Sequence, residues 1–476
     1  MRILSVLLLL ALAAPASARP TDVNGGDLRK FAAADVVEHY DTTRFRVFFT
    51  RAGANAVPSA SADGVTPDYV KEVGALYESV LDFYLGRGFL SPLSDAGAPN
   101  NGGDERFDVY LVDFAGSADG SFVRERCSGG TCSGYMVEEN DFAGYAYPSA
   151  TIANRILSSH EFFHAVQAAY SADQDVVVAE GTAVWATEQF DPTLSDFEGF
   201  VGGYLSMADH SIDRPGTGPV PSFAYGMAIF FEFLSEKVGA DVIRALWEDC
   251  RAGARGIDQQ TWLPALVALL PRDHATTFAD AFTDFATWNL FTLGRADPAR
   301  GYARGAGYPL LKGTGVTLPY TDEAMRVFYA SEQVLDVTVG ARTSLVVDVV
   351  PAAGAAQETL AALRVVIAPL VAGKIGTLTT RAATDAATPI ALGGASEVLV
   401  ALVGTATSGD STRGILCIGD EAEAAACRAA HAPAPDMGTM PTDGGGGCSI
   451  PARRPPPIGC FVFLALALLG VRRRAR

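Results

Sequence analysis

The chain has 476 residues, of which 49% are hydrophobic and 19% charged, and its formal net charge is -18. This length and composition are typical of a globular protein with room for two domains. Because 54 acidic residues face only 36 basic ones, binding of nucleic acid through a basic surface is excluded as the basis of its function.

The first residues have the pattern of a secretory signal peptide. Arg2 precedes an apolar run from Ile3 to Ala14, which is followed by the small-x-small sequence Ala16-Ser17-Ala18. The run is shorter than the roughly 20 residues that cross a bilayer. We therefore expect residues 1–18 to be cleaved and the chain to be exported.

Export makes disulfide bonds possible, and the chain has seven cysteines. Cys127 and Cys132 bracket a short polar loop, and Cys417 and Cys427 form a plausible second pair. Cys250 lies in a helical pattern and is expected to be a buried thiol. The sequence alone leaves the connectivity open.

The first domain is expected over residues 19–320, where strand and helix patterns are mixed. Strands are predicted at 43–50, 107–114 and 134–139, the last as an edge strand. Helices are predicted from apolar spacing at 67–85, 150–170, 180–190, 223–238, 240–250, 263–269 and 278–291.

The second domain is expected over residues 321–430, where short β-patterned runs are separated by Gly, Thr, Ala and Asp. These runs lie at 335–339, 344–350, 363–367 and 398–403. They predict a β-sandwich, so the fold class of the whole chain is α+β.

A metal-binding pattern occurs in the predicted helix at 150–170, as His160-Glu161-Phe162-Phe163-His164. Two histidines four residues apart lie on one face of a helix and can bind one metal ion. Glu161 can then act as the general base for a metal-bound water. The chain has only six histidines, which makes a chance occurrence uncommon. The alternative is a pair of structural histidines on a core helix.

A third ligand is predicted on the following helix. Glu180 begins the segment Glu180-Gly181-Thr182-Ala183-Val184-Trp185, and the loop 171–175 lets this helix fold back on the first. A catalytic Zn²⁺ site has three protein ligands and one open position. His160, His164 and Glu180 are therefore the predicted zinc ligands.

With both motifs in place, the sequence resembles the gluzincins of the peptidase-MA type, and in particular a group of secreted metalloproteases found mainly in myxobacteria. The resemblance covers about Phe45 to Tyr308, including the segments FDVYLVD, GYMVEEND and Tyr225-Gly226-Met227. It implies a zincin-like metalloprotease domain. It also assigns His160, His164 and Glu180 to zinc and Glu161 to catalysis. The stretch 175–179 lacks the aromatic residue that many relatives carry before the Glu-Gly pair.

Further residues have weaker predictions. Tyr225, at the head of a predicted helix, is the candidate donor to the oxyanion, with a core aromatic as the equal alternative. Glu188 is either a partner that orients a ligand histidine or a solvated helix residue. Glu138 and Glu139, on the expected edge strand, and the nearby Asp141 predict an acidic rim that favours basic substrates.

The C-terminal end has the form of an anchor. A Pro- and Gly-rich linker at 431–447 leads to a tail at 448–476 that begins at Cys448, continues with an apolar run and ends in arginines. It resembles myxobacterial C-terminal sorting signals, with a plain tail anchor as the alternative. We expect the protein at the cell surface or outer envelope, or released from it, and attached to membrane only through this tail.

The function predicted from these features is a zinc-dependent endopeptidase with a peptide or protein substrate. One alternative is a non-catalytic zinc-binding adhesin or scaffold with the same fold. Another is a zinc hydrolase that acts on a non-peptide bond. The sequence predicts no oligomeric state.

Overall fold

The computed structural model describes residues 19–22, 29–214, 222–257 and 260–431. The chain divides into two compact units, residues 1–432 and 433–476, and all described elements belong to the first. The expected signal peptide at 1–18, most of the linker and the tail at 448–476 lie outside the described residues. In the described part of the chain, no helix combines the length and apolar character needed to cross a membrane.

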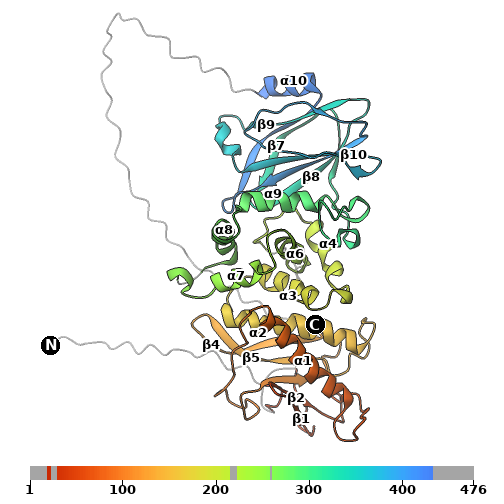
Figure 1. The fold of residues 1–476 in the computed structure, drawn as a ribbon, viewed down its shortest axis with the longest axis vertical. Coiled ribbons are helices and arrows are strands. Elements are labelled where there is room, and N and C mark those ends of the chain that lie inside the picture. The colour runs from red at the N-terminus through yellow and green to blue at the C-terminus, as the bar shows by residue number, and fades with distance from the viewer. Residues whose placement is uncertain (1–18, 23–28, 215–221, 258–259, 432–476) are drawn as a thin grey trace, which may run out of the picture. The chain divides into compact units, whose positions relative to one another are not determined.

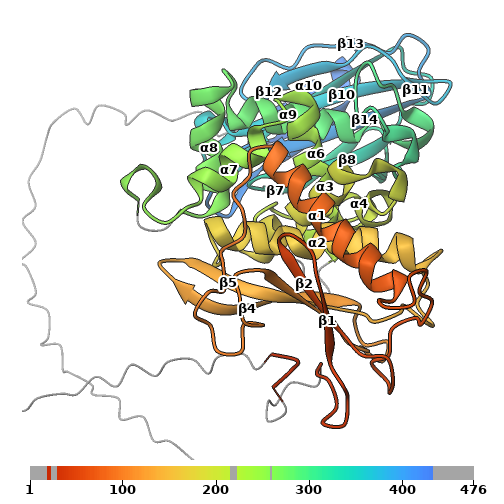
Figure 2. The same ribbon diagram turned by 60° about the horizontal axis from the view of Figure 1, so that its bottom comes forward.

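A five-stranded sheet forms the N-terminal part of the fold (Figures 1 and 2). Its strand order is β1-β2-β3-β5-β4, with β2, β3 and β5 parallel and the two outer strands antiparallel to their neighbours. The predicted strands at 43–50 and 107–114 are confirmed. The strands are β1 (Glu38–Asp41), β2 (Phe45–Phe49), β3 (Phe107–Leu111), β4 (Gly120–Ser128) and β5 (Thr131–Glu138).

The prediction of the edge strand was wrong. The segment 134–139 belongs to β5, which lies between β3 and β4, so β4 is the strand at this edge. The sequence of β4, GSFVRERCS, carries three charges and lacks the apolar alternation that marks a half-buried strand. Strand order depends on pairing between distant segments, which local periodicity does not report.

Nine α-helices follow the strands or connect them among the residues described up to Asn289. They are α1 (Asp68–Gly86), α2 (Ala150–Tyr170), α3 (Val176–Phe190), α4 (Phe197–Leu205), α5 (Ser222–Gly226), α6 (Ala228–Lys237), α7 (Val242–Asp249), α8 (Trp262–Asp273) and α9 (Phe278–Asn289). The predicted helix at 150–170 is confirmed with the same bounds. The helix predicted at 223–238 is divided into α5 and α6, and α4 was not predicted.

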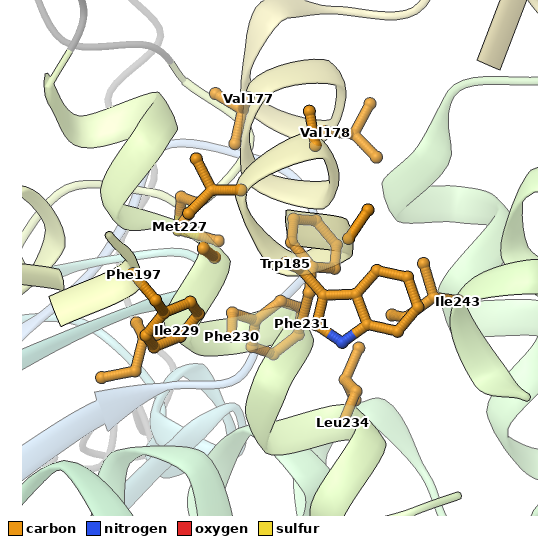
Figure 3. Close-up of a cluster of buried hydrophobic side chains, with 14 of the residues drawn as sticks. Val177, Val178, Trp185, Phe197, Met227, Ile229, Phe230, Phe231, Leu234 and Ile243 are labelled. Carbon is orange, nitrogen blue, oxygen red and sulfur yellow. The ribbon is translucent and has the colours of Figure 1, made fainter. Parts of the chain in front are cut away.

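Helix α3 begins earlier than predicted because Asp175 caps it. The Asp175 carboxylate accepts hydrogen bonds from the backbone N–H groups of Val177 and Val178, which places the N-terminus one turn before Glu180. Figure 3 shows the apolar face of α3, where Trp185 packs beside Phe231. Glu180 is thus held on a helix whose other side is buried.

Two further sheets follow α9 and share one hydrophobic core. One sheet has the order β11-β10-β14-β8-β6, with β12 paired to β10, and the other has the order β13-β9-β15-β7. Val337 and Val400 of the first sheet belong to the same cluster as Val347 and Leu416 of the second. Together with the N-terminal part, this makes the fold α+β.

The four predicted runs overlap β8, β9, β10 and β14, and the other six strands of these sheets were not predicted. The strands of the two sheets are β6 (Thr314–Thr317), β7 (Tyr320–Phe328), β8 (Ser331–Thr338), β9 (Ser344–Pro351), β10 (Leu363–Val371), β11 (Lys374–Ile375), β12 (Thr379–Ala382), β13 (Ile390–Ala391), β14 (Glu397–Gly404) and β15 (Ser411–Gly419). Strand β6 lies before residue 321 and pairs with β8. The helix α10 (Glu421–His431) ends the described part.

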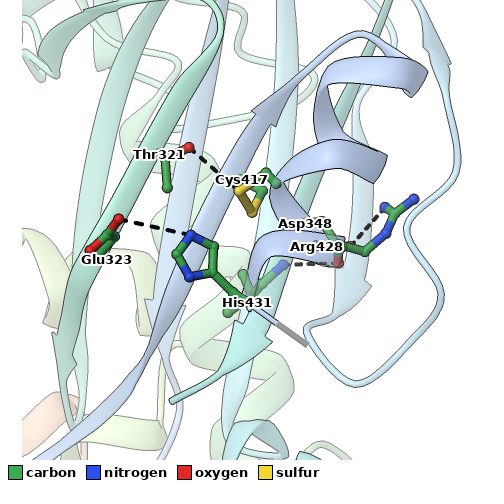
Figure 4. Close-up of a disulfide and its surroundings, with 8 residues drawn as sticks. Thr321, Glu323, Asp348, Cys417, Arg428 and His431 are labelled. Carbon is green, nitrogen blue, oxygen red and sulfur yellow. Dashed lines mark hydrogen bonds and ion pairs between the residues drawn. A yellow bond between two sulfur atoms is a disulfide. The ribbon is translucent and has the colours of Figure 1, made fainter. Parts of the chain in front are cut away.

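Both suggested disulfide bonds are present. Cys127 lies opposite Cys132 in the register of β4 and β5, and their bond closes that hairpin. The second bond joins Cys417 of β15 to Cys427 of α10 (Figure 4). Cys250 is a buried free thiol, as predicted.

Arg19 is buried in a cluster of three carboxylates, which belong to β3, β4 and the loop before β3. The residue is only 1% exposed, although arginine is rarely buried unless it is paired. Its guanidinium lies 2.6 Å from Asp95 Oδ2 and 2.7 Å from Glu125 Oε2, and it also contacts Asp108. Its backbone N–H donates to Asp22. Arg19 therefore ties the start of the described chain to β3 and β4.

Replacement of Arg19 by Met is expected to destabilise the fold by about 3 to 5 kcal/mol, because it leaves buried carboxylates without their cation. With the expected cleavage after Ala18, Arg19 would be the first residue of the mature chain. Urea unfolding followed by tryptophan fluorescence measures the effect. Arg413, which is exposed, is the control, and Arg413→Met should change stability by less than about 1 kcal/mol. Equal midpoints for the two variants would contradict a structural role for Arg19.

Candidate metal centre

Helix α2 has one face that packs into the core and one that carries the motif. Phe162 contacts the rings of Phe45, Tyr77 and Phe107, with centroids 5.2 to 5.6 Å apart. Phe163 packs against Tyr84 of α1 and Phe89 of the loop after α1. These contacts fix the rotation of α2. The histidines then point toward α3.

The three predicted ligands come together between α2 and α3. His160 Nε2 lies 3.2 Å from Glu180 Oε2, and His164 Nε2 lies 3.5 Å from the same oxygen. One ligand atom of each residue lies within 4.8 Å of the others. Within the described ranges, these three residues form the one such cluster of three or more His, Cys, Asp or Glu side chains.

The distances from the two histidines to Glu180 are compatible with a shared zinc ion. Two atoms bound to zinc at about 2.0 to 2.1 Å in a tetrahedron lie roughly 3.3 to 3.4 Å apart. The distances of 3.2 and 3.5 Å to Glu180 Oε2 bracket that value. The same distances also suit hydrogen bonds between the imidazoles and the carboxylate. The donor set, two imidazoles and one carboxylate, is one that zinc uses in catalytic sites.

Gln167 orients His164. The Gln167 amide nitrogen donates to Ala179 O at 2.8 Å and to Thr182 Oγ1 at 2.9 Å, so its Oε1 must act as acceptor. His164 Nδ1 lies 2.8 Å from that oxygen and therefore donates its proton. This leaves Nε2 as the atom that faces Glu180 and is available to a metal. The sequence analysis did not single out Gln167, although its position three residues after His164 on the same helix is a signal that could have identified it.

Contact between Glu180 and the two histidines shifts the pKa values of Glu180 and His164 in opposite directions. Burial lowers the pKa of His164, but the hydrogen bond and negative charge of Glu180 outweigh it and raise that pKa to about 9. Burial would raise the pKa of Glu180, yet the hydrogen bonds from His160 and His164 hold it well below its ordinary value. A metal ion that binds here therefore displaces a proton from His164.

Glu161 lies beside the cluster and is held by the edge strand. The Phe122 N–H of β4 donates to Glu161 Oε2 at 3.2 Å. Glu161, His164 and Glu180 line the same cavity, which has a volume of about 400 Å³ and which we call the site cavity. A larger cavity of about 550 Å³ is lined by other residues, among them Leu81, and by none of the predicted site residues.

Tyr225 also lies at the site. Its ring stacks on His160, with centroids 5.7 Å apart and planes 5° from parallel. Burial, followed by the negative charges of Glu180 and Glu161, raises the pKa of Tyr225 above its ordinary value. The phenol therefore stays protonated and remains a hydrogen-bond donor. The residue is only partly buried, and its five-residue helix α5 packs against α3.

Two secondary predictions were wrong. Glu188 fits neither alternative, because it is buried and its carboxylate forms an ion pair with Arg304. Glu138 and Glu139 form no exposed acidic rim, because both are buried. Glu138 accepts a hydrogen bond from Tyr77 at 2.7 Å, and burial raises the pKa of Glu138 to about 8.

Gly181 on α3 lies against two neighbouring helices. A Cβ added at Gly181 would lie 2.7 Å from the ring of Phe231 on α6 and 3.2 Å from Ala224 O on α5. The glycine therefore permits the close approach of α5 and α6 to α3. This approach brings Tyr225, the next residue after Ala224, to the metal centre.

Comparison with known proteins assigns the chain to no family. No family model matches the chain. No curated protein matches its sequence.

Proposed function

We propose that the chain is a zinc-dependent endopeptidase of the gluzincin type, with a zincin-like domain followed by a β-sandwich domain. The observation that carries the proposal is the convergence of His160 and His164 on one oxygen of Glu180. The cluster has three members within the described residues, whereas structural zinc sites have four protein ligands. Glu161, together with a cavity that His164 and Glu180 also line, would supply the remaining requirements of a catalytic site.

The proposed roles follow from the chemistry of each side chain. Zinc, when bound, supplies a Lewis acid that polarises the scissile carbonyl and lowers the pKa of a water molecule. Glu161 accepts a proton from the attacking water and passes it to the leaving amine. Tyr225, which stays protonated, donates to the oxyanion. Gln167 keeps His164 in the tautomer that presents Nε2.

Export is part of the proposal. Two disulfide bonds are typical of proteins that fold outside the cytosol, which supports the expected signal peptide at residues 1–18. The tail at 448–476 is the proposed attachment to the cell surface. The substrate is then a peptide or protein that the chain meets outside the cell.

Metal analysis combined with peptide cleavage tests the proposal. We expect the purified full chain to bind about one zinc ion and to cleave members of a peptide library. A chelator should abolish cleavage, and added zinc should restore it. Stoichiometric zinc without cleavage of any peptide would favour the adhesin or scaffold alternative. A chain that binds no zinc would contradict both.

A further inference from the structure

The site cavity is lined by one charged residue, Arg124, to which the proposed reaction gives no role. Besides Glu161, His164 and Glu180, the cavity is lined by Phe122 and Arg124 of β4, and by residues of α2, α3, α7 and the loop after α2. A substrate side chain next to the scissile bond would enter this space. The groups that it meets there determine which side chains are accepted.

The polar amides on the wall are already engaged. Gln167 uses both amide hydrogens on Ala179 O and Thr182 Oγ1. Gln174 donates to Ser171 Oγ at 3.2 Å and to Gln260 O at 2.9 Å. Its oxygen accepts from the backbone N–H of Trp262. These amides therefore have no free donor for a substrate.

Arg124 differs from these amides because its guanidinium is free. Within the described ranges it forms no ion pair or hydrogen bond, although it lies on the edge strand that also holds Glu161. The adjacent Glu125 is directed elsewhere, since its carboxylate pairs with the buried Arg19. A β-bulge separates Arg124, which pairs with Gly134, from Arg126, which pairs with Ser133. Bulges of this kind re-aim side chains beside active sites.

The charge that remains available to a substrate is thus positive. The Glu180 carboxylate already contacts the two histidines, and Glu161 is the proposed base, so neither negative charge is left to bind a substrate side chain. We propose that Arg124 recognises an acidic side chain next to the scissile bond, so that the enzyme prefers substrates with Asp or Glu at that position. A guanidinium binds a carboxylate through two parallel hydrogen bonds, which favours Glu over the isosteric Gln. This inference rests on the proposed peptidase function and replaces the expected preference for basic substrates.

The expected preference is modest because Arg124 is exposed. A surface ion pair contributes little, so we expect kcat/KM for a Glu peptide to exceed that for the matched Gln peptide by about 3- to 10-fold. The Lys peptide should be the poorest of the three. Raising the salt concentration should reduce the preference, since exposed charges are screened.

The test compares three peptides that differ only at one position next to the scissile bond, with Glu, Gln or Lys there, and repeats this on both sides of the bond. For the wild-type full chain, kcat/KM on one side of the bond should decrease from the Glu peptide to the Gln peptide to the Lys peptide. In Arg124→Glu the order of kcat/KM on that side should reverse. A general loss of activity would lower all three values without changing their order. Arg126→Glu, on the same strand but outside the cavity lining, is the matched control and should keep the wild-type order.

The outcomes separate this inference from the function on which it rests. A wild-type chain that cleaves the peptides without preferring Glu on either side would overturn the role of Arg124 and leave the peptidase proposal intact. An unchanged order in Arg124→Glu would do the same. Failure of the zinc-loaded wild type to cleave any peptide would overturn the proposed function and this inference with it.

Discussion

Glu161→Gln is expected to lower peptide turnover by several orders of magnitude, on the order of 10³-fold, while zinc stays bound. Gln keeps the shape of the side chain and an oxygen that can accept the hydrogen bond from the Phe122 N–H. It cannot accept the proton of the attacking water. The expected loss is therefore in kcat, with KM nearly unchanged. Zinc content and steady-state kinetics on the same preparation measure both effects.

A matched substitution tests whether this loss is specific. Glu188→Gln changes a buried carboxylate that pairs with Arg304, away from the proposed reacting groups. We expect that variant to keep most of the activity. Unchanged turnover in Glu161→Gln would remove the proposed mechanism, because no other carboxylate among the described residues both lines the site cavity and lies outside the ligand set.

Glu180→Gln is expected to weaken zinc binding by at least about 100-fold, more than loss of an outer partner does. The carboxylate supplies the one oxygen toward which both His160 and His164 point. A neutral amide is a poorer zinc ligand and does not offset the charge of the cation. Competition with a fluorescent chelator measures the affinity directly, without reference to catalysis.

The control for the zinc measurement lies on the same helix. Glu188→Gln makes the identical change two turns further along α3, and its zinc affinity should equal that of the wild type. If Glu180→Gln bound zinc as tightly as that control, the predicted ligand set would be wrong. The interaction of Glu180 with the histidines would then be a structural ion pair.

The candidate metal centre was largely predictable because its parts are local. His160 and His164 are four residues apart, so any helix places them on one face. Glu180 follows on the next helix after a short loop, which leaves few ways to pack the two helices. The structure brings all three together, and it also brings Tyr225 to the site. Whether zinc binds there and whether peptides are cleaved stay predictions.

The edge strand was not predictable in the same way. The segment that became β5 has the apolar pattern of a buried strand, and nothing in it indicates that β4 covers its outer side. As a consequence, Glu138 and Glu139 were placed on an exposed rim, and Arg124 was not considered. The wrong strand order therefore led to a wrong expectation for the charge beside the candidate site.

Local spacing thus determined the helices α2 and α3, the cluster of three candidate ligands and the position of Glu161, the proposed base. The two disulfide pairs were also within reach, since each closes a short loop. Tertiary structure alone decided the order of the strands, the burial of Arg19 among three carboxylates and the position of Arg124 on the cavity wall. The reason is that helical neighbours are separated by three or four residues, whereas these contacts join segments that only the packed chain brings together.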